Sequence, residues 1–293
     1  MLSLEKNYKK DNSIALSIDL EDFSFDIARS YGLKTKTNKF ALDKCYEVIK
    51  KYLDKNLRNT KITFFSTGSL AREYPELLSR IFQDGHEIAS HYNHHDLMTG
   101  QSLEEIEDNL GIAKESIKLA VGDDPLGFRA PAFSIKPDNY DVFNLIGKYF
   151  KYDSSCVVHS NELDKFKKHF YNNISTELIE FPIVSSKYLF INIKSGGTFF
   201  RLFPYSFTKK VIEHNLENGF LPQVYLHPYD LLTDFEFGLS FNELKGINFY
   251  QRLTKYLRQY QWLSLNNKST LSKLKLLSKE YSHIGTIRSH IGI

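Results

Sequence analysis

The chain has 293 residues, of which 42% are hydrophobic and 25% are charged, and these values are typical of a globular protein with a sizeable core. Its formal net charge is only +3, so the composition gives no case for nucleic-acid binding, which usually brings a strong basic bias. The two cysteines, Cys45 and Cys156, are too few for a disulfide framework and do not form a zinc-ribbon pattern.

Apolar runs that end in polar residues predict strands, and helical spacing of apolar residues predicts the helices between them. We expect strands at 14–18, 61–66, 85–89, 127–130, 149–153 and 221–226. We expect helices at 39–57, 75–82, 138–147 and 241–258, and one that Ser102 opens, because Ser102 and Glu105 have capping-box spacing. Strands that alternate with helices favour a parallel α/β sheet or barrel in a single domain over 1–293.

Two histidines, His91 and His95, follow the third expected strand and are four residues apart. Side chains at this spacing can point the same way where the backbone turns or is helical. Neutral imidazole is a common zinc ligand, so the pair is a candidate for part of an open metal site. We expect the neighbouring His86 and His94 to be non-ligands.

Three acidic residues, Asp19, Glu21 and Asp22, follow the first expected strand. Alone, such a cluster is more typical of a solvated loop or of a helix N-terminus, where acids complement the dipole. With the histidine pair, one carboxylate becomes the natural third ligand and another a general base. At the ends of two later strands stand an arginine, Arg129, and a histidine, His227, which proline follows.

Arg129 stands beside a proline-stiffened turn and can hold a carboxylate through two hydrogen bonds, which would fix Asp19 in its ionised form. His227 could protonate a leaving amine. Taken singly, a surface ion pair and a structural histidine are the more common roles of these residue types. Ionisable groups at the carboxyl ends of several strands are a stronger signal than any one of them.

In this order along the chain, the four motifs resemble those of the polysaccharide deacetylase family, also called the NodB-homology or carbohydrate esterase four family. The branch associated with exopolysaccharide biosynthesis is the most similar. Its three segments correspond here to Asp19-Leu20-Glu21-Asp22, to Tyr152-Asp153-Ser154-Ser155 and to Gly196-Gly197-Thr198-Phe199-Phe200-Arg201-Leu202-Phe203-Pro204-Tyr205. The resemblance covers the core of the chain, about 13–260, and leaves a helical, basic tail over 261–293.

The resemblance implies an α/β fold, a distorted (β/α) barrel with fewer than eight strands. It also implies a divalent metal, with Zn²⁺ first and Co²⁺ or a similar ion as the alternative. Carried over residue by residue, it gives metal ligands Asp22, His91 and His95, with Asp19 as general base, Arg129 orienting it, His227 as general acid, and Asp153 behind that histidine or lining the cleft. The family motif has two adjacent aspartates, and here two residues separate them, so Glu21 stays open as the alternative to Asp22.

The predicted function is removal of an N-acetyl group from a sugar in surface-polysaccharide or glycolipid biosynthesis. The substrate would be an N-acetylated sugar, an oligosaccharide or a lipid-linked sugar, with no nucleic acid as partner. One alternative is a metal-dependent amidohydrolase or deformylase that acts on another amide. A second is a non-catalytic carbohydrate-binding relative, against which the complete set of metal, base and acid positions argues.

The N-terminal residues lack an apolar core, so we expect no secretory signal, and no run approaches the roughly 18–20 apolar residues that span a bilayer. We therefore predict a cytoplasmic protein, with the inner face of the membrane as the alternative. Lysines and leucines alternate through the tail, which could lie on an anionic membrane or pack on the barrel. The oligomeric state is not set by the sequence.

Overall fold

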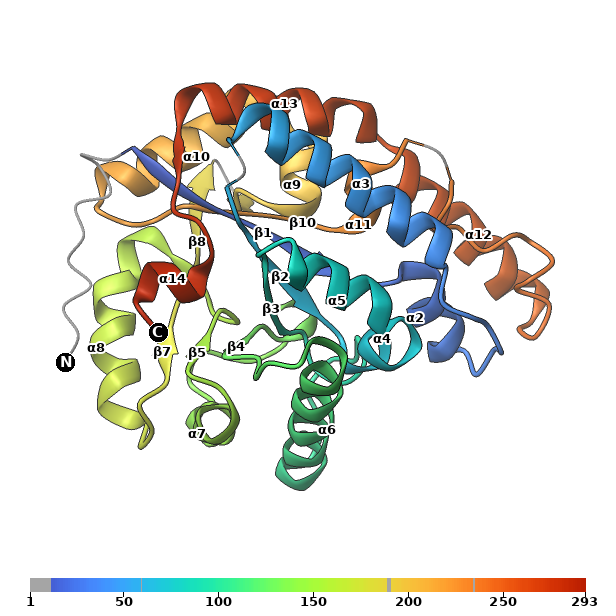
Figure 1. Ribbon diagram of the computed structural model, residues 1–293, viewed down its shortest axis with the longest axis horizontal. Helices are drawn as coiled ribbons and strands as arrows, with labels where there is room; N and C mark the ends of the chain where they lie inside the picture. Colours follow the sequence, from blue (N-terminus) through green and yellow to red (C-terminus); the bar gives the residue numbers. More distant parts are fainter. Residues whose placement is uncertain (1–11, 59, 189–190, 234) are drawn as a thin grey trace.

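The computed structural model describes residues 12–58, 60–188, 191–233 and 235–293. Its centre is a curled sheet whose strands follow the order β10-β1-β2-β3-β4-β5-β7, and every pairing in that order is parallel (Figure 1). These strands are β1 (Ser13–Leu20), β2 (Thr63–Ser66), β3 (Glu87–Ser90), β4 (Gly127–Phe128), β5 (Tyr152–Asp153), β7 (Ile179–Glu180) and β10 (Gln223–Leu226). The short β11 (Ser282–His283) pairs with β1 outside this order. The prediction of a distorted (β/α) barrel with fewer than eight strands is confirmed, because seven strands form the curled sheet.

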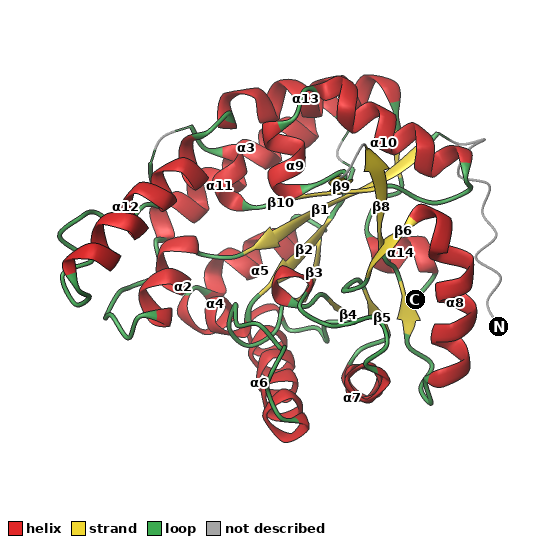
Figure 2. Ribbon diagram, turned by 180° about the vertical axis from the view of Figure 1, so that it is seen from behind, coloured by secondary structure: helices red, strands yellow, loops and turns green. Residues whose placement is uncertain are grey.

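Helices surround the sheet, and Figure 2 shows the same arrangement from behind. Those of the first half are α2 (Phe23–Ser30), α3 (Lys39–Asn56), α4 (Gly68–Glu73), α5 (Pro75–Gln83), α6 (Leu103–Val121) and α7 (Tyr140–Tyr149). Those of the second half are α8 (Leu163–Asn173), α9 (Gly197–Leu202), α10 (Tyr205–Glu217), α11 (Pro228–Leu231), α12 (Phe249–Ser264), α13 (Asn267–Glu280) and α14 (Ile287–Ile291). A smaller sheet contains β6 (Val157–His159), β8 (Ile183–Tyr188) and β9 (Ile191–Ile193) in the order β6-β8-β9.

The main sheet curls far enough for its two edges to meet through a side chain. Gln223, the first residue of β10, donates from Nε2 to the carbonyl of Phe181 at 2.7 Å and to that of Pro182 at 2.9 Å. Phe181 directly follows β7, the strand at the other edge of the sheet. In the part of the chain that the structure describes, no strand ladder joins β7 to β10, so these amide hydrogen bonds close the barrel.

The central strand β1 is buried along all eight residues, as expected for a parallel strand between the barrel interior and the surrounding helices. Local signals set the helices around it. The predicted capping box is present at α6, where Ser102 and Glu105 each bond the other's backbone N–H. At the other end of α6, Gly122 has φ +78°, a left-handed conformation that glycine adopts without a steric penalty.

The predicted helix over 241–258 is displaced in the structure. Residues 241–247 form turns, and α12 begins only after Asn248, whose side chain accepts from the N–H of Gln251 and caps the helix. In the tail, α13 packs on the barrel through the buried Leu274 and Leu277. Among the described residues, no helix has both the length and the apolarity that a bilayer span requires.

Candidate active site

The ionisable residues of the predicted motifs gather at the carboxyl ends of the central strands. Asp19 lies at the end of β1, His91 directly follows β3, Arg129 directly follows β4, and His227 directly follows β10. Because neighbouring parallel strands end at the same edge of a sheet, these four side chains come from one end of the barrel. The sequence motifs therefore meet in a single site.

Arg129 is fully buried and forms the centre of this end of the barrel. Its Nη1 donates to Asp19 Oδ1 at 2.6 Å and to Ser17 Oγ at 2.9 Å, and its Nη2 donates to Ser154 Oγ and to Gln223 Oε1. The guanidinium also lies over the ring of Phe65, 4.0 Å from its centroid. A buried carboxylate needs such a partner, so Arg129 holds Asp19 in place and compensates its charge.

His91 and His95 belong to a loop, and their rings lie with centroids 5.3 Å apart. The backbone turns there because Tyr92 has φ +69°, and the first N–H groups of α4 bind the carbonyls of Tyr92 and Asn93. His91 Nδ1 lies 2.8 Å from the carbonyl oxygen of Arg129 and can only donate to it, which leaves Nε2 as an unprotonated, ligand-type nitrogen. Burial lowers the pKa of His91 to about 4, which also favours the neutral ring.

Glu21 is the carboxylate that faces the two histidines. Ligand-type atoms of Glu21, His91 and His95 all lie within 4.8 Å of one another. Glu21 Oε2 is buried and lies 2.6 Å from His95 Nε2, with which it pairs when that ring is protonated. Burial raises the pKa of Glu21, but the charge of His95 outweighs it and lowers that pKa to about 2. For His95 the directions are reversed: burial lowers its pKa, but the charge and hydrogen bond of Glu21 outweigh burial and raise the pKa to about 9.

Asp22, the ligand preferred from the sequence, has a different task. Its Oδ1 accepts from Ser24 Oγ at 2.6 Å and from the N–H of Phe25 at 3.1 Å, and its Oδ2 accepts from the N–H of Asn38 at 2.6 Å. These contacts make Asp22 the N-cap of α2. The geometry therefore replaces Asp22 by Glu21 in the candidate metal site, because the Asp22 oxygens are already satisfied by backbone and hydroxyl donors.

Two imidazoles and one carboxylate fit a divalent metal. The donor types are those of open catalytic zinc sites, in which three protein ligands leave room for water or substrate. A cation bound here would take the place of the His95 proton that faces the buried Glu21 Oε2. His94, by contrast, lies outside this group. His86 accepts from the N–H of Ile62 and is also outside it.

His227 is held by Asp230, a residue for which we predicted no role. Asp230 Oδ2 lies 2.9 Å from His227 Nδ1 and 2.9 Å from the His227 backbone nitrogen. The other Asp230 oxygen lies 3.2 Å from Arg201 Nη1, and the His227 ring stacks on Tyr229 with centroids 4.9 Å apart. Burial lowers the pKa of His227, but the hydrogen bond and charge of Asp230 outweigh it and raise the pKa overall.

Asp153 does not lie behind His227. Its oxygens accept from the hydroxyl and N–H of Ser155, and its carboxyl sits in a fully buried group with Glu180 and Cys156. Burial and the neighbouring Asp153 raise the pKa of Glu180 well above its usual range. Ser155 Oγ in turn accepts from the N–H of Ala130 at 2.8 Å. Asp153 therefore supports, through Ser155, the loop that carries Arg129.

The two glycines Gly196 and Gly197 bring backbone close to the site. A Cβ on Gly196 would lie 2.3 Å from Tyr225, and one on Gly197 would lie 2.8 Å from Tyr225 and 3.3 Å from His227. Gly197 also has φ +55°. The segment continues through α9 to Arg201, which pairs with Asp230. Its glycines therefore lie against Tyr225, and its arginine holds the carboxylate that binds His227.

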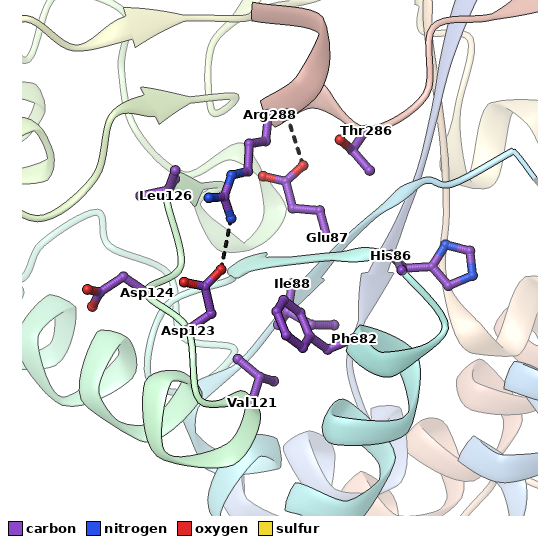
Figure 3. Close-up of a pocket in the computed structure, with 11 residues that line it drawn as sticks. Phe82, His86, Glu87, Ile88, Val121, Asp123, Asp124, Leu126, Thr286 and Arg288 are labelled. Carbon is purple, nitrogen blue, oxygen red and sulfur yellow. Dashed lines mark hydrogen bonds and ion pairs between the residues drawn. The ribbon is translucent and has the colours of Figure 1, made fainter. Parts of the chain in front are cut away.

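A separate pocket of about 290 Å³ lies near the start of β3 (Figure 3). Glu87, Asp123 and Arg288 project into the region shown there, with Arg288 Nη1 2.9 Å from Asp123 Oδ2. The Arg288 N–H donates to Glu87 Oε2, and this contact docks α14 against β3. Because Glu87 begins β3 and His91 follows its end, this pocket is at the opposite end of the strand from the candidate site.

A sequence model of the polysaccharide deacetylase family matches residues 25–148, which include His91, His95 and Arg129. The matched segment belongs to this family. A second model, a domain of unknown function (DUF3473), matches residues 156–275. That second segment supplies β7 and β10 to the main sheet, and it supplies His227, Asp230 and Arg201 to the site.

Curated relatives match this chain only in part. A peptidoglycan-N-acetylmuramic acid deacetylase of Bacillus subtilis is 34% identical over 70 residues, which are 24% of this chain and 27% of that protein. Chitin deacetylase 1 of Cryptococcus neoformans is 38% identical over 74 residues, which are 25% of this chain and 16% of that protein. The matched part therefore spans less than a third of either relative.

A crystal structure of a Mycobacterium smegmatis protein classed with the polysaccharide deacetylases has the same fold. It superimposes with a TM-score of 0.51 at 16% identity and covers 92% of this chain and 91% of that chain. The likeness therefore extends over both matched segments.

Proposed function

We propose that this protein is a metal-dependent hydrolase that removes an N-acetyl group from a sugar. The observation that carries the proposal is the convergence of three units at one end of the barrel. These are the group Glu21, His91 and His95, the Arg129–Asp19 pair, and the His227–Asp230 pair. The partial matches to deacetylases of peptidoglycan and chitin support a polymeric or oligomeric N-acetylated sugar as substrate.

Glu21, His91 and His95 would hold the cation, which we propose is Zn²⁺. When bound, such a cation supplies a Lewis acid for the acetyl carbonyl and acidifies a water molecule. Its ligands must be unprotonated, and the neutral His91 meets this condition, whereas His95 has to release the proton that pairs it with Glu21.

Asp19 is the proposed general base. It accepts the proton of the attacking water while Arg129 holds it in a fixed orientation at 2.6 Å. The new C–O bond forms at the acetyl carbon, the C–N bond to the sugar breaks, and acetate leaves. Because Arg129 is bonded to four different oxygens, it cannot follow Asp19 if that side chain moves, which keeps the base in its working position.

His227 is the proposed general acid, which gives its proton to the departing sugar amine. Its Nδ1 faces Asp230, so the proton for the amine is that on Nε2. Asp230 stabilises the protonated ring, and Arg201 and Tyr229 hold the pair in place. With these roles the chain needs no covalent nucleophile, and water and amide convert to acetate and amine.

The proposal is tested by acetate release from N-acetylglucosamine oligomers, with formate and ammonia measured in parallel on other amides. Acetate release that Asp19→Asn abolishes, without loss of bound metal, supports these assignments. Release of formate or ammonia instead would favour the amidohydrolase alternative. Sugar binding by calorimetry without turnover, on metal-loaded protein, would favour a non-catalytic relative. Surface-polysaccharide or glycolipid biosynthesis, a lipid-linked substrate and a cytoplasmic location remain predictions.

A further inference from the structure

The exposed side of α12 carries a cluster of large apolar side chains outside the site. Five of its residues are large, apolar and exposed, namely Phe249 (69%), Tyr250 (75%), Leu253 (40%), Leu257 (55%) and Tyr260 (56%). At roughly 100° per residue, all five fall within about 100° of the helix circumference. The helix packs on the protein through the buried Gln259 and Leu263, which lie outside this arc. We call the five residues the α12 face.

The segment that carries this face is strongly and exclusively basic. Between Leu244 and Lys279 the sequence has eight lysines and arginines and no aspartate or glutamate, although the whole chain has a net charge of only +3. Arg258 and Lys268 are exposed, and neither forms an ion pair with a described carboxylate. Arg258 lies over the ring of Trp262, which is itself partly exposed.

We propose that the α12 face docks on the surface of an anionic lipid bilayer. An interfacial helix combines an apolar face of aromatic and leucine side chains with a basic flank, and α12 has both. The cations complement the charge of anionic head groups, which attract Lys and Arg near a membrane surface. The two leucines of the face, Leu253 and Leu257, lie between its aromatic edges and favour acyl chains over a sugar surface.

The position of α12 relates this surface to the candidate site. A series of ring contacts runs from Trp262 to Phe23 (6.0 Å between centroids), from Phe23 to Tyr229 (5.3 Å) and from Tyr229 to His227 (4.9 Å). In Figure 1, α12 lies next to α2, the helix that follows the carboxyl end of β1. A bilayer bound at the α12 face would therefore be next to the elements that carry the site.

Co-sedimentation with vesicles tests the proposal on the full chain. We expect binding to vesicles that contain phosphatidylglycerol and at least tenfold weaker binding to pure phosphatidylcholine vesicles. The double variant Leu253→Glu/Leu257→Glu should lower binding to the anionic vesicles at least tenfold, because it puts two charges where acyl chains would be. Arg258→Gln should lower it about fivefold, the usual contribution of one cation at such a surface.

The matched control is Leu119→Glu on α6, another exposed leucine (77%) on a helix outside the α12 face. It should bind vesicles as the unmodified protein does. Failure of the unmodified protein to sediment with anionic vesicles would overturn the proposal, and so would equal losses in the α6 and α12 variants. A dimer in analytical ultracentrifugation that Leu253→Glu/Leu257→Glu dissociates would also overturn it, since the face would then bind a second copy.

The docking proposal does not depend on the deacetylase activity. Acetate release from short, soluble oligomers should be the same in the unmodified protein and in Leu253→Glu/Leu257→Glu, because neither leucine belongs to the site. Vesicle binding without acetate release would therefore contradict only the proposed function. Acetate release without vesicle binding would contradict only the membrane surface. Circular dichroism melts of each variant establish that it is folded.

Discussion

The substitution Asp230→Asn tests how the general acid works. Asp230 Oδ2 lies 2.9 Å from His227 Nδ1, and its charge is a main reason why the pKa of His227 is raised. Loss of an opposite charge within about 4–6 Å lowers the pKa of such a group by about 1–3 units, or about 1.4 kcal/mol for each unit. His227 must be protonated to act, so activity is lost as pH rises through its pKa. A lower pKa moves that loss to lower pH.

The assay is the pH dependence of kcat/KM for acetate release, which reports groups of the free enzyme. We expect the alkaline limb to move down by about 1–3 pH units, with kcat/KM nearer to normal at low pH. Asp230→Asn also leaves the buried Arg201 without its carboxylate, so a thermal melt and the double variant with Arg201→Met separate instability from the pKa effect. An unmoved alkaline limb at reduced rate would refute the role assigned to Asp230.

Two further predictions compare neighbouring or matched residues. Glu21→Gln should remove most of the bound metal measured by mass spectrometry. Asp22→Asn should retain the metal and lose about 1 kcal/mol of stability, because it weakens the cap of α2. If Glu21→Gln kept its metal and Asp22→Asn lost it, Asp22 would again be the preferred ligand. Gly197→Ala should lower kcat and stability, because its Cβ would crowd Tyr225 and His227. The control is Gly219→Ala, at a glycine that has a similar positive φ and no atom within 4 Å of an added Cβ. It should lose only the free energy of the backbone strain, about 1 kcal/mol. Equal effects of the two glycine substitutions on kcat would contradict the close approach at Gly197.

The sequence was sufficient for the elements whose local signals are strong. Strand β1 is a mostly apolar run, and the Ser102 capping box begins α6 where predicted. The Arg129–Asp19 contact was also predictable, because strand ends of a parallel barrel meet at one edge. Helix α12 was placed too early, since the apolar residues from Phe241 onward mimic helical spacing before the true cap.

Sequence spacing could not decide between Glu21 and Asp22, because both lie near the start of a loop. The direction in which a loop side chain points depends on backbone angles that the sequence does not reveal. A usable signal was present, since an aspartate directly before an amphipathic segment is a typical N-cap, and Asp22 is one. Asp230 had a signal of the same kind, three residues after His227. The burial of Asp153 had none, because a two-residue strand does not reveal how deep its side chains lie.

The account depends most on a metal at Glu21, His91 and His95 that sugar deacetylation requires. The direct measurement is metal content together with acetate release from an N-acetylglucosamine oligomer, before chelation, after it and after Zn²⁺ is restored. We predict one metal ion per chain at first, loss of both metal and acetate release on chelation, and recovery of both with Zn²⁺, but no recovery in His91→Ala. Undiminished acetate release from metal-free protein would contradict the account.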